Sequence, residues 1–332
     1  MNRKLPLVAC LLTAFSVSSW SLNIVLTNDD SYATDNVQIA FEKLKAAGHD
    51  VILSAPCLGQ SGKGGSINFL TGVNVESVGS DQHCVGDKDT SLASEDFVSG
   101  TPVMAALYGI DILAKAKWGK YPDLVVSGPN EGNNLGYITN NSGTIGAANM
   151  AIARNIPTIA ISADSEDEAT ANLVVDVLLD VIDELVEQQT EGEALLPNFT
   201  GLNINTPEDM ANNKGIQFTN VGWNTNGLDA TFTQDLSTDP VALNYVAQKV
   251  LQDTPQLSLE QALAYAASTF TAKENLTGIS ASITPVIVDE NPDSEGVALK
   301  QDYITISTID GSIQATKAKV ALTRLKLNAL VN

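Results

Sequence analysis

The chain has 332 residues, of which 44% are hydrophobic and 17% charged, a composition typical of a folded protein with one large domain or two modest ones. Its 39 Asp and Glu outnumber 18 Lys and Arg, and the net charge of −21 at pH 7 disfavours binding to a nucleic-acid polymer or to an anionic membrane surface. Only two histidines, His49 and His83, and no CxxC pair are present, which argues against sites with two or three His ligands and against structural zinc.

The first residues predict export. Two basic residues precede an apolar run over residues 5–17, and Ser19-Trp20-Ser21 offers small residues at the two positions that a signal peptidase reads. The run is too short to span a bilayer. We therefore expect residues 1–21 to be a signal peptide and the mature protein to be periplasmic or secreted. A lipoprotein cleavage box at Leu7-Val8-Ala9-Cys10 is the alternative.

From residue 22 onward, strand and helix patterns alternate. Apolar runs predict strands at 22–27, 51–55, 124–126 and 157–162, and helical spacing predicts helices at 36–47, 102–117, 142–155 and 169–188. Strands that alternate with helices are typical of a parallel sheet covered on both faces. The sequence therefore predicts an α/β fold with three layers: a Rossmann-like, mostly parallel sheet between helices.

The pattern is weaker after Pro197. Strands are expected at 201–205, 215–221 and 304–309, one helix at 257–267 and a terminal helix at 315–330. The sequence thus adds a C-terminal extension of strands and a helix to the predicted α/β core.

Three polar loops follow strands of the predicted sheet. Asn28-Asp29-Asp30 follows the first strand, residues 60–66 follow the second, and residues 127–136 follow the buried strand at 124–126. Ligands of open α/β sheets gather beyond the carboxyl ends of the strands. We therefore expect the chemistry of this protein in these loops.

The first and third loops carry oxygen ligands for a cation. Adjacent carboxylates, here Asp29 and Asp30, are costly unless a cation lies between them, and Asn130 can add a neutral oxygen. Such ligands suit Mg²⁺ or Mn²⁺. An ordinary turn is the alternative for the Asp pair, because Asn and Asp are common turn residues.

The second loop and a helix start suit an anion. Residues 60–66 offer a hydroxyl, backbone amides and a Lys without the spacing of a P-loop, and a flexible loop is the alternative. Ser142-Gly143-Thr144 begins a helix whose free amides can bind phosphate; simple N-capping by Ser142 is the alternative. A divalent cation that faces an anion-binding helix start implies metal-assisted hydrolysis of a phosphate ester.

Two cysteines, Cys57 and Cys84, remain once a signal peptide that contains Cys10 is removed. An oxidising compartment permits a disulfide between them. Two buried free thiols are the alternative, and the sequence does not decide between them.

An ordered set of motifs resembles the survival protein SurE family. In chain order these are Ile24-Val25-Leu26-Thr27-Asn28-Asp29-Asp30, Ala55-Pro56 with Gln60-Ser61-Gly62, Gly100-Thr101-Pro102, Pro122-Asp123-Leu124-Val125-Val126-Ser127-Gly128 with Asn130, Gly132 and Asn134-Leu135-Gly136, and Ser142-Gly143-Thr144 with Ala147-Ala148. The resemblance implies a phosphatase domain over residues 22–222, a divergent insertion over 223–282, and C-terminal strands and a helix over 283–332 that complete the fold or contact a second chain.

The resemblance also implies an activity and a set of site residues. It implies a metal-dependent 5'-nucleotidase that converts nucleoside monophosphates to nucleoside and phosphate, uses Mg²⁺ or Mn²⁺, and forms a homodimer or higher homo-oligomer. By position, the implied metal ligands are Asp29, Asp30, Ser61 and Asn130, with Asp30 as the catalytic carboxylate. Asn28 is the second implied catalytic residue. Phosphate oxygens are implied to contact Asn28, Gly62, Ser142, Gly143 and Thr144. A broad phosphomonoesterase, or a phosphate- or nucleotide-binding protein without turnover, is the alternative.

The chain departs from the family pattern at several positions. Ser31 stands where the family has Gly, and a left-handed backbone there would be strained by Ser. Cys57, Met150 and Thr308 replace the family's Asp, Glu and Pro, and the Asp that follows Gly-Thr-Pro is absent. The proposed ligands are intact, so these departures bear on substrate choice and dimer geometry.

Overall fold

The computed structural model describes residues 21–93, 95–164, 167–227, 229–254, 256–272, 275–282 and 286–330. All but the last residue of the predicted signal peptide lie outside the described residues. None of the helices in the described ranges has the length and apolar character that a membrane span requires.

A mixed sheet of nine strands, counted over the described residues, runs through the centre of the molecule. Its order is β3-β4-β2-β1-β5-β6-β7-β11-β8. The strands are β1 (Asn23–Thr27), β2 (Asp50–Pro56), β3 (Val75–Gly79), β4 (Gln82–Val85), β5 (Leu124–Glu131), β6 (Thr158–Ala163), β7 (Thr200–Asn205), β8 (Ile216–Thr219) and β11 (Ile304–Asp310). The strands from β4 to β7 pair in parallel, whereas β3 and β11 lie antiparallel to β4 and β7. The prediction of a mostly parallel sheet is confirmed.

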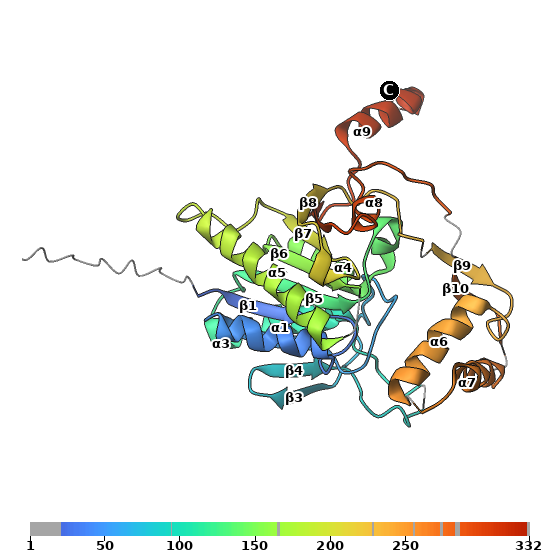
Figure 1. Cartoon of the computed structure of the whole chain (residues 1–332). Coiled ribbons are helices and arrows are strands. Elements are labelled where there is room, and N and C mark those ends of the chain that lie inside the picture. Colours follow the sequence, from blue (N-terminus) through green and yellow to red (C-terminus); the bar gives the residue numbers. More distant parts are fainter. Residues whose placement is uncertain are drawn as a thin grey trace, which may run out of the picture.

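Helices cover both faces of this sheet. On one face lie α1 (Asp35–Ala46) and α5 (Glu168–Glu187), side by side in Figure 1. On the other lie α2 (Pro102–Tyr108), the π-helical turn η1 (Gly109–Leu113), α3 (Ala114–Trp118) and α4 (Gly143–Ile152). Successive residues of β1 serve the two faces in turn: Ile24 and Leu26 belong to the core under α1 and α5, and Val25 to the core under η1 and α4. The three-layer prediction is therefore confirmed.

The order of the strands locates a site. From β1 the chain continues to β2 on one side and later to β5 on the other side. Connections to either side of a strand leave a crevice at the carboxyl end of the sheet. The first and third polar loops begin at this point, between β1 and β5.

A smaller unit lies beside the main sheet (Figure 1). It contains β9 (Asp229–Thr233), α6 (Pro240–Asp253), α7 (Leu259–Thr271) and β10 (Gly278–Ser282). β9 and β10 pair antiparallel, and α6 packs on α7 through Ala247, Ala262 and Ala266. Only α7 matches a predicted element. Sequence analysis missed α6 because its apolar residues are divided between a small alanine-based core and a pocket, so they form no wide apolar stripe.

The chain returns to the core after this unit. α8 (Glu295–Leu299) is followed by β11, which pairs with β7 and β8 inside the main sheet. The 3₁₀ turns η2 (Gly136–Asn141), η3 (Met210–Asn212) and η4 (Asn328–Leu330) complete the elements. The last helix, α9 (Lys317–Lys326), has no buried residue and projects from the body near the C-terminus (Figure 1).

Candidate active site

A pocket of about 490 Å³ opens where the loops after β1 and β5 meet. Five of the residues predicted for the site line it: Asp29, Ser61, Gly62, Asn130 and Ser142. The other four, Asn28, Asp30, Gly143 and Thr144, are their sequence neighbours and lie outside the lining. The structure thus brings three distant loops together, and the chemical roles of these nine residues stay predictions.

The loop after β1 is held by its own side chains. The Oδ1 of Asn28 accepts a hydrogen bond from the amide of Ser31 at 3.2 Å, and its Nδ2 donates to the Oγ1 of Thr34 at 3.3 Å. Ser31 has a φ of 126°, so it occupies the backbone region that favours glycine. Its hydroxyl donates to the carbonyl of Cys57 at 3.1 Å. This bond, which glycine would lack, holds the strained residue in place.

The carbonyl that accepts this bond belongs to a disulfide. Cys57 and Cys84 are bonded, with their Cα atoms 4.7 Å apart, and connect the end of β2 to β4. Of the two alternatives that the sequence left open for these cysteines, the structure has the disulfide and not two free thiols. The loop that carries the paired aspartates is therefore anchored, through Ser31, to a covalently fixed part of the sheet.

Asp29 contacts the start of α4. Its Oδ1 accepts a hydrogen bond from the Oγ1 of Thr144 at 2.5 Å. Burial raises the pKa of Asp29, whereas this bond and bonds from the backbone amides of Gly143 and Thr144 oppose the rise. A Cβ atom on Gly143 would lie 2.7 Å from that of Asp29, so only glycine permits this approach.

The start of α4 is therefore partly occupied by a protein carboxylate. The Oγ of Ser142 also accepts from the amide of Ile145 at 3.1 Å, which is the N-cap contact that the sequence gave as the alternative. Ser142 nevertheless lines the pocket, whereas Thr144 is fully buried behind Asp29. Phosphate binding at this helix start stays a prediction.

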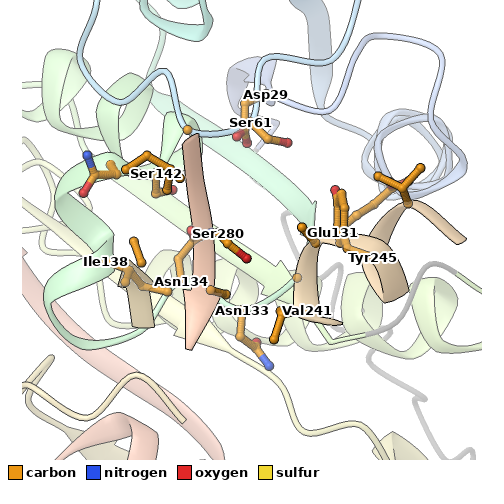
Figure 2. A pocket seen from close by; sticks show the side chains of 18 of the residues that line it. Asp29, Ser61, Glu131, Asn133, Asn134, Ile138, Ser142, Val241, Tyr245 and Ser280 are labelled. Carbon is orange, nitrogen blue, oxygen red and sulfur yellow. The ribbon is translucent and has the colours of Figure 1, made fainter. Parts of the chain in front are cut away.

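Backbone contacts hold the second loop against the first. The amide of Gln60 donates to the carbonyl of Asp29 at 2.7 Å. A Cβ atom on Gly146 of α4 would lie 2.2 Å from the carbonyl oxygen of Gly64, so the loop packs directly on the helix backbone. Ser61 is thereby placed next to Asp29, as Figure 2 shows.

The third loop begins at an irregularity in β5. The pairing of β5 with β6 shifts register between Ser127 and Asn130, and such irregularities re-aim side chains near functional sites. The Nδ2 of Asn130 donates to the carbonyl of Gly132 at 2.5 Å, which leaves its amide oxygen as the available ligand. The Oδ2 of Asp30 accepts from the amide of Glu131 at 2.7 Å, so Asp30 is turned toward β5.

The proposed metal ligands match a hard cation in their chemistry. They are two carboxylates, a hydroxyl and an amide oxygen, the donors that Mg²⁺ and Mn²⁺ accept. No Lys, Arg or His is among the described residues that line the pocket. A bound cation would therefore supply the positive charge that balances the buried carboxylate of Asp29. Across the described ranges, no three His, Cys, Asp or Glu side chains converge as a metal site, and the set therefore depends on its two neutral oxygens.

The opposite side of the pocket was not predicted. We call it the apolar wall; its large side chains are Leu236, Val241, Tyr245, Val246, Phe270 and Ile279. Figure 2 shows Val241 and Tyr245 on the helix opposite Asp29 and Ser61. These residues are spread over α6, α7, β10 and a loop, so no short motif joins them. The spacing of Val241 and Tyr245, one helical turn apart after an Asp-Pro helix start, is the signal that could have found two of them.

Comparisons with known proteins identify the family to which this chain is similar. The family model of survival protein SurE matches residues 24–227. An acid phosphatase of Yarrowia lipolytica is 32% identical over 204 residues, which are 55% of this chain and 56% of that protein. A 5'-nucleotidase SurE of Thermosipho melanesiensis is 31% identical over 187 residues, which are 56% of this chain and 65% of that protein. The chain thus matches 56% of the length of the first relative and 65% of the length of the second.

A solved structure shares the fold. The crystal structure of the SurE protein from Aquifex aeolicus superposes with a TM-score of 0.63 at 23% identity and covers 92% of this chain and 99% of that one. The α/β architecture described above is therefore common to both chains.

Proposed function

Because the chain belongs to the survival protein SurE family, we propose that it is a metal-dependent phosphatase that hydrolyses nucleoside monophosphates to nucleoside and phosphate. Relatives named 5'-nucleotidase and acid phosphatase support this activity class. The observation that carries the proposal is the placement of Asp29, Ser61 and Asn130 in one pocket, next to a helix start. These groups come from three loops that lie far apart in the sequence.

Oxygen atoms of Asp29, Asp30, Ser61 and Asn130 would hold the proposed cation. When bound, Mg²⁺ or Mn²⁺ neutralises phosphate charge and lowers the pKa of a bound water. The burial that raises the pKa of Asp29 makes a nearby positive charge favourable for its ionised form. The contact of Thr144 with Asp29 fixes the orientation of that carboxylate.

The remaining residues position the phosphate and the water. Asp30, oriented by the amide of Glu131, is the proposed carboxylate that orients or deprotonates the attacking water. Gly62 and Ser142 line the pocket and are proposed to contact phosphate oxygens. Asn28, Gly143 and Thr144 contribute in this scheme by shaping the loop and by holding Asp29.

A broader phosphomonoesterase is the second candidate. The similarity to a protein named acid phosphatase favours it. The two candidates differ in the organic group that they accept, so a panel of nucleoside monophosphates and one generic phosphomonoester separates them.

Two features outside the pocket are also proposals. We propose that the protein is exported, because residues 1–21 have the pattern of a signal peptide and the mature chain contains a disulfide. We propose a homo-oligomer because α9 has apolar residues such as Leu322 and Leu325 that no part of the described chain buries.

The activity is tested by phosphate release from this panel with Mn²⁺ and with a chelator. We expect release with the metal, none with the chelator, and recovery when Mn²⁺ or Mg²⁺ is restored. Asp30→Asn should lower kcat about 10²- to 10⁴-fold, because it removes a proton acceptor and a cation ligand. The exposed Asp35, which lies outside the pocket, provides the control Asp35→Asn.

Two results would contradict the proposal. Release that is indifferent to the chelator would exclude the metal, and near-normal turnover by Asp30→Asn would reject the role of that carboxylate. Binding of phosphate or nucleotide with no release from any ester would instead identify a binding protein without turnover.

A further inference from the structure

The apolar wall has no role in the proposed chemistry, although it forms much of the pocket. Its residues follow position 227, where the match to the family model ends. The side chain of Tyr245 is 63% exposed and that of Ile279 is 61% exposed. Large apolar side chains that remain exposed in a pocket mark a surface that a ligand covers.

Hydrogen bonds hold the wall together. The carboxylate of Asp239 accepts from the amides of Val241 and Ala242, at 3.1 and 2.9 Å, and thereby caps α6. The same carboxylate accepts from the hydroxyl of Ser280 on β10 at 2.6 Å. One carboxylate thus joins the helix that carries Tyr245 to the strand that carries Ile279.

A second carboxylate connects the wall to the core. Asp229, at the start of β9, accepts from the hydroxyl of Thr225 at 2.8 Å and from the phenol of Tyr137 in η2. η2 also contributes Ile138 and Asn141 to the pocket lining. The wall is therefore fixed relative to the polar loops, and the distance between the two sides of the pocket is set by the fold.

The two sides offer different chemistry to one ligand. The polar loops supply carboxylates, a hydroxyl and amides, whereas the wall supplies aliphatic groups and two aromatic rings. Since no Lys, Arg or His lines the described pocket, a second phosphate on the ligand would find no positive side chain. A ligand with one phosphate at one end and an uncharged, planar ring at the other end matches both sides.

We propose that the apolar wall is the subsite for the organic group of the substrate, and that Tyr245 is its specificity-determining residue, packing against a planar aromatic ring. This inference rests on the proposed function, which places the phosphate at the polar loops. The enzyme then prefers monophosphate esters that carry an aromatic ring. Glycerol 3-phosphate, which has no ring, and inorganic polyphosphate, which has many charges, are poor substrates.

The test compares Tyr245→Ala with Tyr265→Ala in the mature protein loaded with Mn²⁺. Tyr265 lies on α7, is 57% exposed and does not line the pocket, so it is a matched control. We expect Tyr245→Ala to lower the ratio of kcat/KM for AMP to that for glycerol 3-phosphate about tenfold, mainly through the KM for AMP, because loss of a ring–base stack weakens binding by about that factor. Tyr245→Phe should restore the ratio, and Tyr265→Ala should leave it unchanged.

A binding measurement separates this inference from the proposed function. Saturation-transfer NMR with adenosine, which has no phosphate, should show contact of the base protons with the wild type and Tyr265→Ala but not with Tyr245→Ala. If no ester is hydrolysed but adenosine binds in this way, the phosphatase proposal fails, whereas the proposal that the apolar wall binds an aromatic ring is supported. An unchanged AMP-to-glycerol-phosphate ratio in Tyr245→Ala, or adenosine contact that persists in this variant, would overturn the inference.

Discussion

The two sides of the pocket differ in structure. The polar side consists of three tight loops at the carboxyl ends of β1, β2 and β5, where glycines permit backbone and side chains to approach closely, as at Gly143 and Gly146. The apolar wall consists of larger side chains on α6, α7, β10 and the loop that carries Leu236, and two of them remain mostly exposed. We therefore expect substitutions on the polar side to impair turnover and substitutions in the wall to change substrate preference.

Within the comparison of the two sides, the largest effect on turnover is expected where the polar side is most closely packed. Gly143→Ala would bring a methyl group to 2.7 Å from the Cβ of Asp29 and 2.8 Å from its Oδ2, so the carboxylate must move. Displacement of a catalytic group by about 1 Å costs about 10²-fold in rate, and we expect kcat for AMP and for glycerol 3-phosphate to fall together by this factor.

A matched control is Gly72→Ala, because a Cβ atom at Gly72 meets nothing within 4 Å. Steady-state kinetics of both variants check the prediction. Activity of Gly143→Ala equal to that of Gly72→Ala would show that Asp29 does not depend on its contact with α4.

Removal of the disulfide tests whether the polar side is anchored separately from the wall. Cys57 and Cys84 are 27 residues apart, and a bridge that closes such a loop stabilises a protein by about 2–4 kcal/mol. We expect the double variant Cys57→Ala, Cys84→Ala to lose about this much free energy of unfolding in urea titrations. It should also lower kcat, because the bond from Ser31 to Cys57 holds the aspartate loop.

The preference for AMP over glycerol 3-phosphate should survive this change, since neither cysteine lines the pocket. A loss of preference as large as the loss of kcat would show that the two sides are not independent. Thiol titration of the unfolded, unreduced mature protein provides a direct check, and two free thiols would contradict the bridge.

The smallest effect on turnover is expected at a buried carboxyl group that does not line the pocket. Glu295 is buried, and its carboxylate accepts from the amide of Gly136 at 3.3 Å, from Asn203 at 3.0 Å and from Ser307 at 2.9 Å. Burial raises the pKa of Glu295 from 4.5 to about 8, against the opposing effect of these bonds. The folded protein therefore retains a proton that the unfolded chain releases between these two pH values.

The stability contributed by this proton is complete below pH 4.5 and is lost as the pH rises toward 8. The free energy of unfolding should fall across this window by up to about 1.4 kcal/mol per pH unit from this group. Urea titrations at several pH values should show a flatter profile for Glu295→Gln than for the wild type, with the exposed Glu290→Gln as control. An identical pH profile in Glu295→Gln would show that this carboxyl does not hold the proton.

The main sheet and the polar loops were largely predictable from sequence. Apolar runs such as Leu124 to Val126 marked buried strands, and helical spacing over residues 36–47 marked the first helix. The edge strand β3 and its neighbour β4 were missed, since β3 is mostly exposed and lacks an apolar run and β4 has only four residues. The strain at Ser31 was foreseen, but its compensation by the Cys57 carbonyl was not, because that contact joins residues 26 positions apart.

The apolar wall was not predictable for a physical reason. Apart from Val246, which also packs on the small core between α6 and α7, its large side chains face the pocket, so they follow neither the spacing of a buried helix face nor a loop motif. Val241 and Tyr245 lie one turn apart, but Ile279 joins them only through the pairing of β9 with β10 and the bond from Ser280 to Asp239. Contacts of this kind exist only once the chain has folded.

The central claim is that one pocket holds a cation at its polar side and an aromatic ring at its apolar wall. It is tested most directly by a crystal structure with Mn²⁺ and a non-hydrolysable phosphonate analogue of AMP, with the metal located by anomalous scattering. We predict an anomalous peak bounded by Asp29, Asp30, Ser61 and Asn130, and the adenine against Tyr245. A peak elsewhere, or an adenine that leaves the wall uncovered while the metal is bound, would contradict it.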